Sequence, residues 1–178
     1  MGLTYISTAT ASSSASLDIT SGIDSTYNEY QFHFVNMNIA TDADEFSFQV
    51  NADGASGFNE TMTTTLFTAY HAENDAYAHL GYNTSSDQAQ GTGYQTLSRN
   101  TANNADAGVN GILTLYAPSS TTYVKHFVCR VVYMHEHDDA WDVYTAGYIN
   151  TTSAIDEISF KAMAGNIDSG SIHMYGVG

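Results

Sequence analysis

The stretch Phe127-Val128-Cys129-Arg130-Val131-Val132-Tyr133 decides the fold class, because nearly every residue in it is aromatic or apolar and several are β-branched. Such residues favour the pleated, half-buried surface of a β-sheet. We predict a strand over residues 122–134, the strongest in the chain. The acidic segment 135–139 follows as a turn, and residues 141–149 return as the hairpin partner.

Alternation of apolar and polar residues recurs on both sides of this hairpin. Phe46, Phe48 and Val50 alternate with small or polar residues, and residues 29–39 form another long candidate strand. Within that strand the apolar face changes near Phe34-Val35, which predicts burial on both sides or a β-bulge. Nine to eleven short strands and no amphipathic helix are expected. The pattern predicts an all-β fold, an antiparallel, jelly-roll-like β-sandwich.

The length of 178 residues suits one domain. We expect an N-terminal strand or arm at residues 1–14, followed by a single β-sandwich domain at residues 15–178. Residues 10–14 are small and polar, which predicts a flexible connection after the first strand. A short strand with such a connection suits domain swapping between subunits.

The charge balance excludes several kinds of partner. Four Lys and Arg residues oppose 19 Asp and Glu residues, for a net charge of −15. That charge repels phosphate backbones and anionic lipids, so no nucleic-acid or membrane partner is expected. The chain also lacks a run of 18 apolar residues that would span a bilayer. Its single cysteine, Cys129, lies in the strongest strand and is expected to be a buried core residue.

The densest group of potential metal ligands is His135-Glu136-His137-Asp138-Asp139. On a strand, His135 and His137 would face the same side, and a following carboxylate such as Asp139 would add a third ligand. These three residues are weak candidates, because a solvated acidic turn is the favoured interpretation of a polar segment between two strands. No cofactor is expected. Loosely bound Ca²⁺ at the acidic run Asp42, Asp44 and Glu45 stays open.

No catalytic motif stands out, so the chain is not expected to be an enzyme. Asp156 and Glu157 are adjacent and would point to opposite faces of a strand, unlike the paired carboxylates of a glycosidase. A sugar-active enzyme that uses Glu73, Asp75 or Glu136 remains a minor alternative.

Tyrosine residues in or beside the expected strands are the candidates for interfaces, because tyrosine combines a rigid apolar ring with a polar tip. For any single tyrosine, packing inside the sandwich is the favoured role. The candidates for an interface are Tyr5, Tyr82, Tyr94 and Tyr148.

The last third of the chain contains a specific succession of short motifs. They are Ser119-Ser120-Thr121-Thr122-Tyr123-Val124-Lys125-His126-Phe127, Ala146-Gly147-Tyr148-Ile149-Asn150-Thr151-Thr152, Ala154-Ile155-Asp156-Glu157-Ile158-Ser159-Phe160 and Gly165-Asn166-Ile167-Asp168-Ser169-Gly170. This succession resembles a family of small virion-associated jelly-roll proteins of marine tailed bacteriophages. The segment 134–143 departs most from that family.

The resemblance implies a virion structural protein located at the virion surface and assembled in the host cytoplasm. We expect a capsid decoration or cement protein that binds the major capsid protein or other virion proteins. Self-association, as a homotrimer by analogy, is also expected. The alternative is a receptor-binding head of a fibre or tail protein, with the polar loops 83–93 and 100–111 contacting host glycans.

Overall fold

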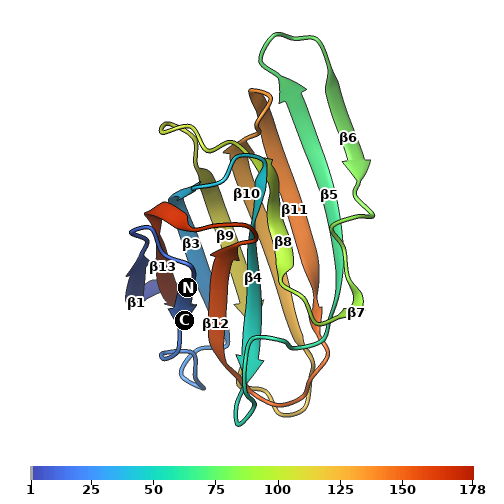
Figure 1. Cartoon of the computed structure of the whole chain (residues 1–178). Coiled ribbons are helices and arrows are strands. Elements are labelled where there is room, and N and C mark those ends of the chain that lie inside the picture. Colours follow the sequence, from blue (N-terminus) through green and yellow to red (C-terminus); the bar gives the residue numbers. More distant parts are fainter. Residues whose placement is uncertain (1) are drawn as a thin grey trace.

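The computed structural model describes residues 2–178, and this part of the chain contains 13 strands and no helix (Figure 1). All strand pairs are antiparallel. The strands are β1 (Leu3–Thr10), β2 (Leu17–Ile19), β3 (Glu29–Ile39), β4 (Asp44–Ala52), β5 (Met62–Ala72), β6 (Ala78–Tyr82), β7 (Ala89–Gly91), β8 (Gln95–Thr101), β9 (Val109–Tyr116), β10 (Lys125–Met134), β11 (Asp139–Ile149), β12 (Ile155–Ala162) and β13 (Ile167–Val177).

The strands form two sheets of unequal width. The nine-stranded sheet has the order β1-β13-β3-β9-β10-β11-β5-β6, with β7 also paired to β5. The four-stranded sheet has the order β2-β12-β4-β8 and covers only part of the larger sheet (Figure 1). From β2 to β5, successive strands alternate between the two sheets. The predicted β-sandwich is confirmed, and this alternation is what a jelly-roll-like connectivity requires.

The core lies between the two sheets and is centred on phenylalanine. Phe160 of β12 contacts Phe34 and Phe46, with ring centroids 5.3 and 6.0 Å apart. Phe48 of β4 meets Phe127 of β10 edge to face at 4.9 Å. Cys129 is a free, buried thiol in the same core, as expected.

The strand β10 pairs with β11 over its whole length, from Lys125 opposite Ile149 to Met134 opposite Ala140. Its residues alternate strictly between buried and accessible.

The predicted bulge in β3 is also present: the pairing with β9 shifts between Phe34 and Met37, and Asn36 has a φ of 51°. The bulge returns Met37 to the buried face that holds Phe34.

Three expectations need correction. Thirteen strands are present instead of nine to eleven, and the polar segment 83–93, expected to be a loop, contains the short strand β7. The connection after β1 was expected to be flexible, but it is tied to β13. Ala11 donates its backbone N–H to the carbonyl of Gly170, and Ser14 forms a bridge with Ile167.

Within residues 2–178 there is no helix of the length and apolarity that a membrane crossing needs.

Candidate functional site

The nine-stranded sheet has one face that no other part of residues 2–178 covers with a second layer. We call this surface the outer face; it consists of the side chains that point away from the four-stranded sheet. Large apolar side chains lie on it in the open, with Ile112 41%, Val128 45% and Val132 46% exposed. Exposed apolar groups scattered singly are ordinary, whereas neighbours on one face point to an interaction surface.

The register of the strands aligns one row of outer-face side chains across eight strands. In this row every residue sits opposite the next on the neighbouring strand. The row runs Tyr82, Phe67, Tyr144, Arg130, Ile112, His33, His173, Thr8.

Aromatic stacking and one arginine order the middle of this row. The rings of Phe67 and Tyr144 stack with centroids 4.8 Å apart and planes 4° apart. The Arg130 guanidinium lies 5.0 Å from the centre of the Tyr144 ring. It also donates two hydrogen bonds to Asp142, from Nε to Oδ1 at 2.9 Å and from a terminal nitrogen to Oδ2 at 2.8 Å. Because these contacts already orient the Arg130 guanidinium, the side chain loses little conformational freedom when a partner binds.

The outer face is nearly free of acidic residues although the chain is strongly acidic. On the outward positions of β3, β9, β10, β11 and β5, the only carboxylates are Glu29 and Asp142, out of 19 acidic residues in the sequence. Asp142 is neutralised by Arg130. Histidine is common on this surface instead, with side chains at His33, His71, His126 and His173.

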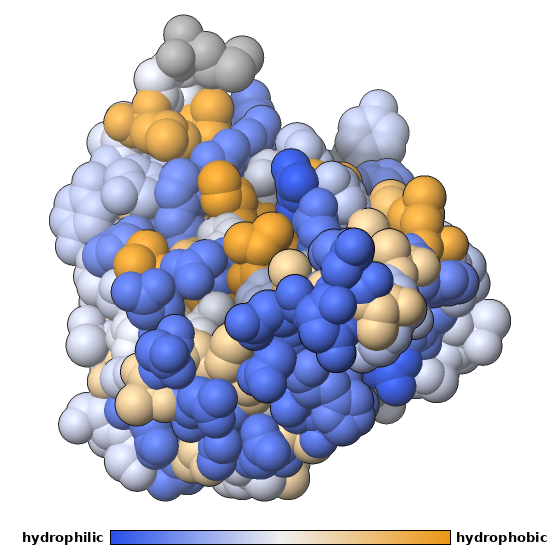
Figure 2. All heavy atoms as spheres, turned by 90° about the horizontal axis from the view of Figure 1, so that it is seen from above, coloured by the Kyte–Doolittle hydropathy of each residue, from blue (hydrophilic) through white to orange (hydrophobic). Residues whose placement is uncertain are grey.

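Acidic side chains gather at one end of the sandwich, in the turns that connect the strands. This end lies at the top of Figure 1, and it is predominantly hydrophilic when seen from above (Figure 2). The acidic residues in these turns are Asp42, Glu73, Asp75, Asp106, Glu136 and Asp138.

Three of the four candidate interface tyrosines lie on the outer face. Tyr5 and Tyr82 are more than half exposed near opposite edges of the sheet, and Tyr148 lies on β11 opposite His126. Tyr94 lies elsewhere: it precedes β8, and its hydroxyl donates a hydrogen bond to Ser159 of the four-stranded sheet. Its ring centre lies 4.2 Å from the Lys161 ammonium. The structure therefore brings three candidates to one surface and separates the fourth.

The second feature is the turn between β10 and β11. It was expected to be a solvated acidic turn, which is wrong for two residues: His135 is 5% and Asp139 3% exposed. His135 is held in the interior because its ring stacks on Trp141, with centroids 4.6 Å apart and planes 11° apart. Trp141 stacks in turn on Tyr70 at 4.6 Å. Burial, the largest influence, lowers the pKa of His135.

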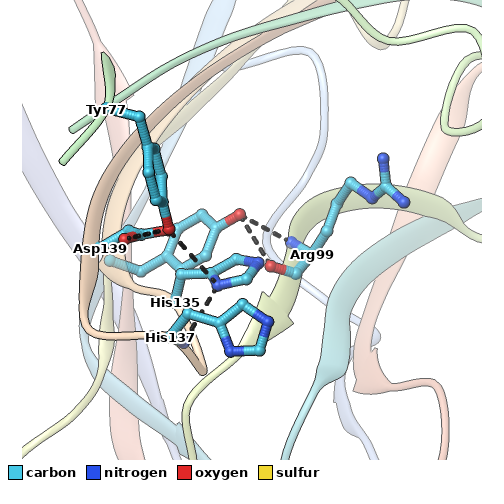
Figure 3. Close-up of polar contacts among 6 residues, drawn as sticks. Tyr77, Arg99, His135, His137 and Asp139 are labelled. Carbon is cyan, nitrogen blue, oxygen red and sulfur yellow. Dashed lines mark hydrogen bonds and ion pairs between the residues drawn. The ribbon is translucent and has the colours of Figure 1, made fainter. Parts of the chain in front are cut away.

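The carboxylate of Asp139 faces this histidine. Its two oxygens accept from the Tyr77 hydroxyl at 3.0 Å each, and Oδ2 lies 3.9 Å from His135 Nδ1. Figure 3 shows the rings of His135 and His137 next to each other, with Tyr77 and Asp139 at one side. One ligand atom from each of His135, Glu136 and His137 lies within 4.8 Å of the other two. The carboxylate in this group belongs to Glu136 and not to Asp139, which was the sequence candidate.

An open pocket of about 310 Å³ adjoins the cluster. Its lining includes Glu73, Tyr77, His137, Asp138 and Asp139, so it is polar and negative. Sequence patterns gave no sign that Tyr77 and Glu73 from the β5–β6 turn would join this site. The register that places Asp139 opposite Ala72 brings them there.

The other acidic candidates serve the fold. Asp44 is buried and accepts from the backbone N–H of Glu45 and of Ala164, and Glu45 accepts from the Thr96 hydroxyl. Asp75 is different: its exposed carboxylate lies 3.0 Å from His71 at the end of β5 that leads into the β5–β6 turn. The loops 83–93 and 100–111 occupy different parts of the sandwich and do not form one binding site (Figure 1).

Comparisons of the chain with protein-family models, with curated proteins and with solved structures found no match. The class that the fold defines is therefore an antiparallel β-sandwich, and the function has to be argued from its surfaces.

Proposed function

We propose that this chain is a structural protein of a tailed-phage particle, a decoration or cement protein that binds the outer surface of the capsid. The observation that carries the proposal is the separation of charge on the molecule. One broad sheet face carries only two acidic residues on its five central strands, while the rest of the chain carries the other 17.

Depletion of charge together with aromatic residues and arginine is the usual composition of the centre of a protein interface. The outer face has this composition in the row from Tyr82 to Ile112, and its centre contains the stacked Phe67 and Tyr144 beside Arg130. The acidic turns at the end of the sandwich would stay in solvent, where their charge keeps decorated particles apart. The resemblance of the last third of the chain to virion-associated proteins supports a partner on the phage particle, and we choose the major capsid protein because a broad sheet face suits a shell surface.

A sheet face is also a suitable surface for a cementing role. The nine strands are held by antiparallel pairing that bulges interrupt at a few positions, so the backbone of this surface is ordered before it binds. Such a surface can bridge neighbouring capsid subunits with little cost of ordering the backbone. Association of the chain with itself, as a trimer, belongs to the same proposal and follows the symmetry of capsid shells.

Co-sedimentation with shells assembled from the major capsid protein tests this proposal. Val128→Glu places a carboxylate in the middle of the outer face, opposite Ala146 and Thr114 and away from other acidic residues. Burying that unpaired charge would weaken binding by tenfold or more, since such charges cost about 2–5 kcal/mol at interfaces.

The matched control is Tyr123→Glu, which changes a side chain that is 70% exposed in the loop before β10, off the outer face. It should bind shells as the unaltered chain does. Failure of the unaltered chain to sediment with shells, or equal binding by Val128→Glu, would contradict the proposal.

A further inference from the structure

We propose that the end of the β10–β11 hairpin binds a divalent transition-metal ion of the Zn²⁺, Ni²⁺ and Cu²⁺ class through His135, His137 and Glu136. The three side chains come from one turn and already place a ligand atom each within 4.8 Å of one another. This site is separate from the outer face and from the proposed capsid binding.

The distances are close to what coordination needs. With metal–ligand bonds of about 2.0–2.2 Å, ligand atoms in a tetrahedral site lie about 3.4 Å apart. The widest separation in the group must therefore shrink by up to about 1.4 Å. The contraction is feasible because His137 is exposed and Glu136 half-buried, so both side chains are free to turn toward His135.

His135 is the fixed ligand. Trp141 stacks on its ring at 4.6 Å, and its Nδ1 accepts a hydrogen bond from the backbone N–H of His137 at 3.2 Å. With Nδ1 accepting, the neutral ring carries its proton on Nε2, which has no hydrogen-bond partner among residues 2–178. Coordination through Nε2 therefore requires the other tautomer, with the proton on Nδ1. A ligand held in place by packing loses little freedom when the ion binds.

Asp139 and Tyr77 supply the support that metal-binding histidines commonly have. A carboxylate that accepts from the protonated, non-ligating nitrogen orients the ring and raises its basicity. In the tautomer that frees Nε2, the proton on Nδ1 faces Asp139. Asp139 Oδ2 lies 3.9 Å from His135 Nδ1, and the Tyr77 hydroxyl holds both oxygens of that buried carboxylate. The carboxylate has only this one hydroxyl as a side-chain donor among residues 2–178, so a nearby cation would stabilise it.

The ligand types select the ion. Two imidazoles and one carboxylate suit zinc, nickel and copper, whereas Ca²⁺ prefers six to eight oxygen ligands. The pocket beside His137 gives access and leaves room for a water or another ligand in the fourth position. Acidic residues around the entrance, among them Glu73 and Asp138, raise the local concentration of cations.

The only tryptophan of the chain reports directly on this site, because Trp141 lies against His135. We would titrate the full chain, without a polyhistidine tag and after treatment with a chelator, with Ni²⁺ while recording tryptophan fluorescence. Bound Ni²⁺ should quench the emission with a stoichiometry of one ion per chain. Zn²⁺, which does not quench, should restore the emission by displacing Ni²⁺, and Ca²⁺ at the same concentration should not.

His137→Ala and Glu136→Gln change accessible turn residues, so both variants should fold. Each should weaken the affinity for Ni²⁺. For His137→Ala we expect a loss of affinity of at least about tenfold, because even changes to residues that only support a metal ligand cost that much. His126→Ala, which removes an exposed histidine from β10, the strand before the turn, is the matched control and should bind Ni²⁺ as the unaltered chain does. Absence of quenching at millimolar Ni²⁺, equal binding by His137→Ala, or displacement by Ca²⁺ as readily as by Zn²⁺ would overturn the assignment.

Discussion

Phe67 of β5 and Tyr144 of β11 stack face to face on the solvent side of the nine-stranded sheet, with ring planes only 4° apart. Large rings on an open sheet face usually need a reason, because their apolar surface stays in water. Here the stack adjoins Arg130, which lies over Tyr144 and is paired with Asp142. The three side chains Phe67, Tyr144 and Arg130 form an ordered, charge-balanced patch at the centre of the proposed capsid-binding surface.

This stack should contribute measurably to stability even without a partner. We expect a coupling of about 1 kcal/mol between Phe67 and Tyr144 in a double-mutant cycle with alanine, in the range found for aromatic pairs. Urea unfolding of the two single variants and the double variant gives the four free energies. Additive losses would mean that the two rings contribute independently and that the stack is not a unit.

Substitutions in the core should lower the free energy of unfolding more than substitutions of exposed side chains. Phe160 is completely buried and touches Phe32, Phe34, Phe46 and Phe48 across both sheets. Phe160→Ala should lower the free energy of unfolding by about 3–5 kcal/mol, since it removes a large side chain and leaves a cavity. Leu80→Ala, at a side chain that is 71% exposed, should change it by less than about 0.5 kcal/mol. Similar losses from both substitutions would place the core elsewhere.

Acidification should weaken the fold through His33. Burial chiefly, and the neighbouring His173 in addition, lower the pKa of this imidazole. Because the unfolded chain then binds a proton more readily than the folded chain, stability is lost as the pH falls below about 6.5, the ordinary value for histidine. His33 also contacts Gln31 and the ring of Tyr175, neither of which is charged at this pH.

The measurement is urea unfolding between pH 7.5 and 5 for the unaltered chain and for His33→Gln. The variant should lose less stability over this range, because the amide does not titrate. Two parallel pH profiles would show that His33 has no part in the loss.

The single thiol should be inert in the folded chain. Cys129 is buried, and burial raises its pKa, so the reactive thiolate is not formed near neutral pH. A thiol-specific reagent such as dithionitrobenzoate should label it only after denaturation. Rapid labelling of the native chain at the same pH would indicate that β10 opens or that the thiol lies at the surface.

Much of the fold could be predicted from residue patterns because alternation reflects burial on one side of a strand. The change of face in β3 led to a correct expectation, the bulge at Asn36, and the alternation in β4 correctly predicted a strand. Burial in β4 does not alternate, however, because Ser47 and Gln49 are buried together with the apolar residues. The strand β7 was missed because its residues, Ala89 to Gly91, contain no apolar alternation and are held by pairing with β5. Local residue preference does not carry that information.

The candidate sites were less predictable. In β10, Phe127 and Val131 face the core while Val128 and Val132 face outward, and both sets are apolar. The set that packs against the four-stranded sheet is buried, and this depends on the tertiary arrangement rather than on the residues of β10 themselves. Likewise, the burial of His135 depends on Trp141 and Tyr70, which reach it through strand register rather than through proximity in the sequence.

The most direct test of the proposed function is a reconstruction of the phage particle that carries this chain, at a resolution that orients the sandwich. We expect the chain on the outside of the shell, with Phe67, Tyr144 and Arg130 against the major capsid protein and the acidic turns toward solvent. A chain located on the tail fibres, or a capsid-bound chain with its nine-stranded sheet exposed to solvent, would contradict the proposal.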